Sequence, residues 1–210
     1  MPAKRCLIEL HYLPSLAWFA AVSGYDEVII EKHEHYVKQT YRNRCYIRGA
    51  NRVEKLIIPL TSKSNHTRIA DLRIDYSQKW LNNHWRSIES AYRNAPYFDH
   101  YADDLSHALF SGTSFLYELN NRLLEVCLKL LNLKVTLKES SQYEKTVQPG
   151  THDLRNQISP KHSGLEKFIK PVAYTQVFGN TFMPNLSIID LLFCTGPESL
   201  AYIKTARISE

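Results

Sequence analysis

The sequence predicts an α/β fold with a single mixed sheet, one hairpin and a cover of helices, of which a Rossmann-like arrangement is one form. Two observations predict it. Short apolar strands alternate with a helix near the N-terminus, and amphipathic helices follow further along the chain. With 210 residues, of which 44% are hydrophobic, the chain is long enough to bury a sizeable core. One domain over residues 1–210 is therefore expected.

The first strands and helix follow from apolar runs and capping residues. Residues 6–10 and 27–31 are short apolar runs that predict buried strands. Between them, Ser15 can cap a helix over residues 16–22, which a Ser-Gly pair ends. This β-α-β order favours an α/β sheet.

A hairpin is predicted next. Residues 44–48 and 56–60 flank a Gly-Ala-Asn turn, and Pro59 cannot donate to a strand ladder, so the second strand ends there or lies at an edge. Residues 68–75 alternate charged and apolar side chains, which predicts a half-buried strand.

The later helices are marked by apolar side chains at three- and four-residue steps. Such helices are expected over residues 81–95, stopped near Pro96, and over 116–130, behind Ser114. A helix that is apolar on nearly every side is expected over 186–194, capped by Asn185 and ended by Gly196 and Pro197. Residues 139–163 are polar and aperiodic, which predicts a long functional or flexible loop.

Several classes of protein are excluded by what the sequence lacks. No apolar run reaches the roughly 18 residues of a membrane span. The N-terminal apolar stretch is too short for a signal peptide, so a cytoplasmic location is expected. The four cysteines form no Cys-x-x-Cys pair, and neither a metal nor a cofactor is assigned.

The positive charge is concentrated in one stretch. Residues 38–55 carry six cations and one acid, a net charge of +5 that equals the net charge of the whole chain. Such a concentration attracts an anionic partner. The alternative is a solvated pair of strands decorated with basic side chains.

Within this stretch, residue types suited to binding an anion follow one another. Arg42, Arg44 and Arg48 can each pair with phosphate or carboxylate, while Gln39 and Asn43 can orient the ligand. A small anionic substrate, a nucleotide sugar or a sugar phosphate, is therefore the expected partner. Nucleic acid is not expected, because no recognised binding module is present.

Three residues are candidates for catalysis: His35, Cys45 and His84. Neighbouring guanidinium groups favour the thiolate of Cys45, and either histidine could act as its base. The alternatives are that Cys45 fills a buried strand position and that His84 is a packed core residue. Glu31, His33 and His35 would share one face of an extended strand and could hold a metal or move protons, with a surface cluster as the alternative.

Asp190 is unusual because apolar residues surround it on nearly every side of its helix. A buried carboxylate needs a partner, and one of the arginines between residues 42 and 48 is expected to supply it. The hairpin and the terminal helix would then meet in a single pocket.

Four motifs occur in order: Tyr-Leu-Pro-Ser at 12–15, Lys-Gln-Thr-Tyr-Arg-Asn-Arg-Cys at 38–45, Ala-Pro-Tyr-Phe at 95–98, and Pro-Asn-Leu-Ser-Ile-Ile-Asp at 184–190. Together they resemble the WbqC-like proteins over essentially the whole chain. The short length and the Arg-Asn-Arg-Cys variant are similar to the branch found in Bacteroidetes. The resemblance implies that the recurring family residues correspond to Tyr12, Pro14, Asn43, Arg44, Tyr97, Asn185 and Asp190. Of these, Tyr12, Tyr97, Asn185 and Asp190 are expected to bind substrate together with the residues of the basic stretch.

The resemblance also implies a role in bacterial surface-polysaccharide biosynthesis or modification. The first hypothesis is an enzyme, of a transferase type, that acts on a phosphate-bearing sugar or metabolite. A nucleotidyl-transfer variant rests on His11 and Pro14 after the first strand. The alternative is a non-catalytic binding or scaffolding protein of glycan assembly, with partner contacts near Tyr97 and Tyr101.

Overall fold

The computed structural model describes residues 3–61, 66–161 and 165–208. Its larger sheet has the order β5-β2-β1-β6, and every neighbouring pair is parallel. The bounds are β1 Arg5–Glu9, β2 Glu27–Glu31, β5 Thr136–Glu139 and β6 Thr151–Asp153. The apolar runs at β1 and β2 place these strands in the centre, where Ile8 and Val28 are fully buried.

The predicted hairpin is present as β3 (Arg44–Arg48) and β4 (Val53–Ile57), which form a separate two-stranded antiparallel sheet. The expected bounds of its second strand, residues 56–60, are wrong, because β4 begins and ends three residues earlier. Strand β4 ends before Pro59, as the missing amide hydrogen predicts. Along β3, Cys45 and Ile47 are buried, whereas Arg44, Tyr46 and Arg48 are half-buried. The period-two alternation therefore separates a core face from a basic face.

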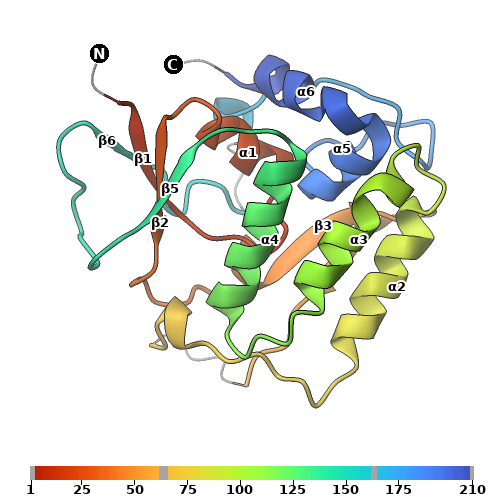
Figure 1. Ribbon diagram of the computed structural model, residues 1–210. Coiled ribbons are helices and arrows are strands. Elements are labelled where there is room, and N and C mark those ends of the chain that lie inside the picture. The colour runs from red at the N-terminus through yellow and green to blue at the C-terminus, as the bar shows by residue number, and fades with distance from the viewer. Residues whose placement is uncertain (1–2, 62–65, 162–164, 209–210) are drawn as a thin grey trace.

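The helices fill the rest of the molecule. They are α1 Leu16–Val22, α2 Trp80–Tyr92, α3 Phe98–Leu109, α4 Leu116–Leu130, α5 Ile188–Thr195 and α6 Ser199–Ala206. Figure 1 shows the parallel sheet on one side of the molecule and α2 and α3 on the other, with α4, α5 and β3 between them. The predicted α/β class is confirmed, and α1, α2, α4 and α5 lie at the positions of the four predicted helices.

The strand expected over residues 68–75 is wrong. Residues 68–75 form no strand but contain the 3-10 helix η2 (Ile69–Asp71) and single bridges such as Leu60 to Ile74. The segment 139–163 contains β6, whose three polar residues are too short a run to stand out; residues 162 and 163 lie outside the described part of the chain.

The helix caps also differ from expectation. Neither Ser15 nor Ser187, the residues before α1 and α5, makes a side-chain cap hydrogen bond, and Phe115 rather than Ser114 precedes α4. Asn185 does not cap α5. Its Oδ1 instead accepts the backbone N–H of Ala17 at 2.9 Å, which caps α1 from 168 residues away.

Within the described residues, no helix is long and apolar enough to cross a membrane.

Candidate functional site

A pocket of about 490 Å³ opens beside the start of β3. Its walls come from the loop after β2, the start of β3, the segment from the end of β4 to Leu60, and the segment before α2. The lining residues are Tyr36, Lys38, Gln39, Asn43, Arg44, Ile57, Ile58, Pro59, Leu60, Asp75 and Gln78. Three residues predicted to bind substrate, Gln39, Asn43 and Arg44, are thus brought together.

Backbone hydrogen bonds hold these walls in place. Ile58 N donates to Asn43 O, Asp75 N donates to Pro59 O, and Tyr36 N donates to Thr67 O, each at 2.9 Å. The frame therefore does not depend on a ligand to bring its segments together.

Some polar atoms of the residues that line the pocket lack a hydrogen-bond partner among the described residues. Asn43 Nδ2 donates to Ile58 O at 2.9 Å, but Asn43 Oδ1 is buried without a hydrogen-bond partner among the described residues. Arg44 Nε is likewise buried and unpartnered there, and no ion pair joins Arg44 to a described carboxylate. Unpaired buried polar atoms cost free energy, so these side chains are suited to a ligand that supplies an anion and hydroxyl groups.

The loop that forms one wall has a strained residue. Gln39 has a φ of 61°, in the left-handed region, while Thr40 Oγ1 donates to Val37 O at 2.7 Å and closes the turn. Non-glycine residues held in this region are found preferentially at ligand-binding loops. Lys38 and Gln39 are both exposed at the mouth of the pocket.

Arg42 lies behind the pocket and does not face it. It is 1% exposed, and its guanidinium pairs with both carboxylate oxygens of Glu34 at 2.7 and 2.6 Å. Its Nη2 also donates to Asn156 Oδ1 at 2.8 Å, and Asn120 Nδ2 donates to its carbonyl at 2.8 Å. The prediction that Arg42 grips an anionic ligand is therefore corrected, because its charge is already matched in the interior.

Arg42 belongs to a buried polar cluster at the carboxyl edge of the parallel sheet. Glu9 ends β1 there, lies 3.1 Å from His11 Nε2, and accepts the backbone N–H of Asn156 at 2.9 Å. Burial acts to raise the pKa of Glu9, but His11, Arg42 and the Asn156 amide together hold it below its ordinary value. His11 itself is fully buried and stacks beside Tyr41, so it offers no exposed imidazole for nucleotidyl transfer.

The same edge continues at β2 and β6. Arg155 Nη1 donates to Glu31 at 3.1 Å and Arg155 pairs with Asp153 through two further hydrogen bonds. Ser140 Oγ and the His33 backbone N–H both donate to Glu31 Oε1 at 2.8 Å. A carboxylate thus ends each of the four parallel strands at this edge: Glu9, Glu31, Glu139 and Asp153.

The predicted face of Glu31, His33 and His35 does not form. Extension stops after Glu31; His33 Nε2 lies 3.0 Å from Ser140 O, and His35 is exposed and bridges to Arg68. No group of three or more His, Cys, Asp or Glu side chains suited to a metal occurs among the residues that the structure describes.

The predicted catalytic thiol and imidazole are in the interior. Cys45 is 1% exposed, and burial raises its pKa, so it is a thiol and not a thiolate. His84 is 6% exposed, and burial lowers its pKa to about 4; its Nδ1 lies 3.0 Å from the Tyr12 hydroxyl. The activation of Cys45 by neighbouring guanidinium groups is therefore corrected: β3 directs Cys45 to the core and Arg44 to the other face.

Asp190 is held by neutral donors. Tyr92 OH donates to Oδ1 at 2.8 Å, and Tyr174 OH and Gln176 Nε2 donate to Oδ2 at 2.6 and 2.9 Å. Burial raises its pKa, whereas these donors and the charge of Arg48 oppose the increase. Arg48 lies at the far end of β3 from the pocket, where its Nε donates to Phe178 O at 3.2 Å. Asp190 thus braces the segment before α5 and does not brace Arg42 or Arg44.

The remaining residues implied by the family resemblance are spread through the molecule, some buried and some partly exposed. Tyr12 is fully buried, Pro14 O accepts Ile188 N at 2.9 Å, and Asn185 caps α1. Tyr97 stacks on Tyr101 with ring centroids 6.4 Å apart, and its ring fills the space that a side chain at position 196 would need. Of that set, only Asn43 and Arg44 line the pocket.

Sequence reasoning missed the carboxyl-edge cluster and part of the pocket wall. The missed residues are Glu9, Glu34, Asp153, Arg155 and Asn156 in the cluster, and Tyr36, Asp75 and Gln78 in the wall. One signal was available, because Glu9 and Glu31 each end an apolar strand run. Parallel strands bring such residues to one edge, which is where ligands bind in open α/β sheets.

The fold and site define an α/β protein with a parallel sheet, a buried charged cluster at the carboxyl edge of that sheet and a polar pocket beside the hairpin. The chain belongs to the WbqC-like protein family, whose model matches residues 10–158 and 164–202.

A relative in Mycobacterium tuberculosis (strain ATCC 25618 / H37Rv), named "Uncharacterized protein Rv1507c", is 27% identical over 232 positions. The alignment covers 97% of this chain and 99% of the relative. A comparison with solved structures finds no significant match.

Proposed function

We propose that this protein recognises a phosphate-bearing sugar or a related anionic metabolite in the pocket beside β3, in the biosynthesis or modification of a bacterial surface polysaccharide. The observation that carries the proposal is that Arg44 Nε and Asn43 Oδ1, which have no hydrogen-bond partner among the described residues, belong to side chains that line one pocket. Arg44 and Lys38 supply positive charge for a phosphate, and Asn43 supplies an acceptor for a sugar hydroxyl.

The rest of the lining suits the same ligand. Ile57 and Pro59, which are at least partly exposed, form an apolar wall against which the carbon face of a sugar can pack, with the buried Ile58 and Leu60 behind it. Gln39 and Gln78 add amide groups that both donate and accept.

Calorimetric titration with glucose 1-phosphate and with UDP-glucose tests the proposal, with glucose as the uncharged comparison. At least one phosphate-bearing ligand is expected to bind, and Arg44→Ala is expected to weaken its affinity at least tenfold, because a charge-assisted hydrogen bond contributes about 1.5–3 kcal/mol. Arg52→Ala removes the same charge from an exposed position in the hairpin turn and is expected to change the affinity less than twofold.

Two results would count against the proposal. One is the absence of binding by either phosphate-bearing compound. The other is an Arg44→Ala variant that binds as tightly as the unmodified chain.

A second candidate function is non-catalytic binding or scaffolding in glycan assembly. It is favoured by the position of the three expected catalytic residues: none of His35, Cys45 and His84 lines the pocket, and two of them are buried. Phosphorus NMR of the bound ligand over several hours, with and without acceptor sugars, separates the candidates. A transferase consumes the phosphate resonance of the donor, whereas a binding protein leaves it unchanged.

A further inference from the structure

The rim of the pocket is both cationic and apolar. Three of the six large hydrophobic side chains that are exposed among the described residues, Val37 (41%), Ile57 (37%) and Tyr76 (43%), lie in or next to segments that line the pocket. Exposed cations accompany them: Lys38 follows Val37, and Lys55 is two residues before Ile57 on β4. Exposed apolar groups that gather at one place indicate an interaction surface.

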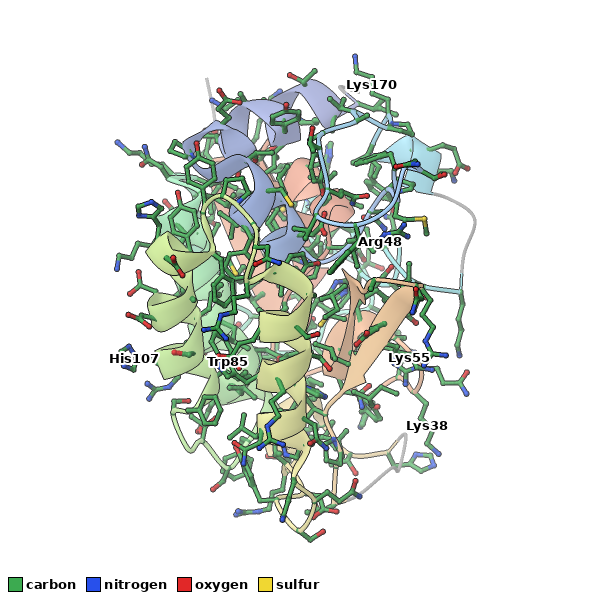
Figure 2. All side chains as sticks on the ribbon, turned by 90° about the vertical axis from the view of Figure 1, so that its right-hand side faces the viewer. Lys38, Arg48, Lys55, Trp85, His107 and Lys170 are labelled. Carbon is green, nitrogen blue, oxygen red and sulfur yellow. The ribbon has the colours of Figure 1, made fainter. Side chains whose placement is uncertain are left out.

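The hairpin orders these side chains on one face. Directly opposite residues in the ladder are Arg44 and Ile57, and two residues further along, Tyr46 and Lys55. Side chains of directly paired residues project to the same side of an antiparallel pair. Each of these two pairs therefore places a cation beside an aliphatic or aromatic side chain on this face. Figure 2 shows Arg48, Lys55 and Lys38 along one flank of the molecule, with His107 and Trp85 on the other side of the view.

We propose that this rim, made of Val37, Lys38, Arg44, Lys55 and Ile57, docks on the surface of an anionic lipid bilayer. The cations pair with lipid phosphates, and Val37 and Ile57 enter the boundary between headgroups and acyl chains. The charge complementarity rests on Lys38, Arg44 and Lys55, because three of the five rim residues are cationic and none is acidic. Arg42, from the same basic stretch, does not contribute, since Glu34 matches its charge in the interior. The aliphatic side chains favour a bilayer over a nucleic acid, which offers no apolar layer for them to enter.

Docking in this position would turn the mouth of the pocket toward the membrane. The inference extends the proposed function, because a phosphate-bearing ligand carried by a lipid could then reach Arg44 without leaving the bilayer. Docking itself does not require that ligand, so the two proposals are tested separately: calorimetry uses water-soluble compounds and no vesicles.

Co-sedimentation with vesicles tests the surface. The chain is expected to bind vesicles of 30% phosphatidylglycerol and 70% phosphatidylcholine, and not vesicles of phosphatidylcholine alone. Each lysine that lies close to the membrane surface contributes about fivefold to such binding, so the pair Lys38→Gln and Lys55→Gln is expected to lower the partition coefficient about 25-fold. The matched control pair, Lys134→Gln and Lys170→Gln, removes the same charge from exposed positions elsewhere and is expected to change it less than threefold.

A second variant tests the contribution of the two aliphatic side chains of the rim. The double variant Val37→Ser with Ile57→Ser leaves the charge of the protein unchanged and is expected to lower vesicle binding at least tenfold. A single-stranded oligonucleotide serves as a polyanion without an apolar layer, and the double variant is expected to bind it as tightly as the unmodified chain does. The proposal is overturned if anionic vesicles are not bound, or if the control lysine pair causes the same loss. It is also overturned if the oligonucleotide binds as tightly as the vesicles and the serine variants bind both normally, since the rim would then be a general polyanion surface.

Discussion

The imidazole of His84 lies between the Tyr12 hydroxyl, 3.0 Å from Nδ1, and the Trp80 ring, whose centroid is 5.0 Å away. Burial lowers its pKa to about 4, and a backbone hydrogen bond to Ile57 opposes the decrease. At neutral pH the side chain is therefore uncharged, which suits a core hydrogen-bonding pair better than a proton shuttle.

This pKa predicts how stability depends on pH. The pKa of His84 is about 4 in the folded chain and about 6.5 when unfolded, so the unfolded state takes up the proton first as the pH falls. The stabilising effect is complete above pH 6.5 and is lost progressively between pH 6.5 and 4, by up to about 3 kcal/mol. Urea unfolding at several pH values measures it.

Two variants isolate the contribution of His84. In His84→Gln, unfolding free energy is expected to decrease less steeply between pH 6.5 and 4 than in the unmodified chain. His107→Gln, an exposed position on α3, is expected to keep the original slope. Equal slopes in the unmodified chain and in His84→Gln would show that His84 is not the titrating group.

At the scale of elements, the N-terminus of α1 depends on a distant residue. Asn185 has a φ of 55°, and this left-handed conformation aims its Oδ1 at the Ala17 amide. Asn185→Ala is expected to lower the unfolding free energy by about 2 kcal/mol, because it removes a cap and strains the backbone, each worth about 1 kcal/mol.

Thermal and urea unfolding of further variants separates the two effects. Asn185→Gly keeps the conformation and loses only the cap, so about 1 kcal/mol is expected. Asn132→Ala, at an exposed residue with a φ of 51°, strains the backbone without removing a helix cap. If Asn185→Ala and Asn132→Ala cost the same, the Asn185 side chain contributes no cap.

Asp190 holds the segment before α5 through hydrogen bonds from Tyr174 and Gln176 to its carboxylate. Tyr174→Phe removes its 2.6 Å hydrogen bond to the carboxylate and leaves Tyr92 and Gln176 in place. A loss of about 2 kcal/mol is expected, because the acceptor is charged and buried. Tyr202→Phe is the control, since the Tyr202 hydroxyl has no hydrogen-bond partner among the described residues. An equally stable Tyr174→Phe variant would contradict this role of Asp190.

At the scale of the whole molecule, periodicity predicted what lies in the core and little of what lies at the surface. The helices α1, α2, α4 and α5 and the strands β1 and β2 have apolar patterns set by burial, so their positions could be read from the sequence. The strands β5 and β6 are short and polar, and only pairing with β2 and β1 makes them strands.

The site was harder to predict, because it depends on which face of a strand a side chain occupies. Arg42, Arg44 and Arg48 are alike in sequence, yet the structure places the first in a buried ion pair, the second at a pocket and the third near Asp190. Long-range pairings such as Arg42 with Asn156, 114 residues apart, leave no trace in local spacing. Composition could indicate an anion-binding stretch but could not show which arginine side chain is free of ion pairs within the protein and can bind a ligand.

The availability of the Arg44 guanidinium can be measured directly by arginine side-chain NMR. The Nε–H signal of Arg44, assigned by its disappearance in Arg44→Lys, is followed during titration with glucose 1-phosphate and UDP-glucose. A ligand bound in the pocket is expected to shift that signal in a saturable way while the signal of Arg52 stays in place. No shift at Arg44, or equal shifts at Arg44 and Arg52, would contradict the assignment of this pocket as the ligand site.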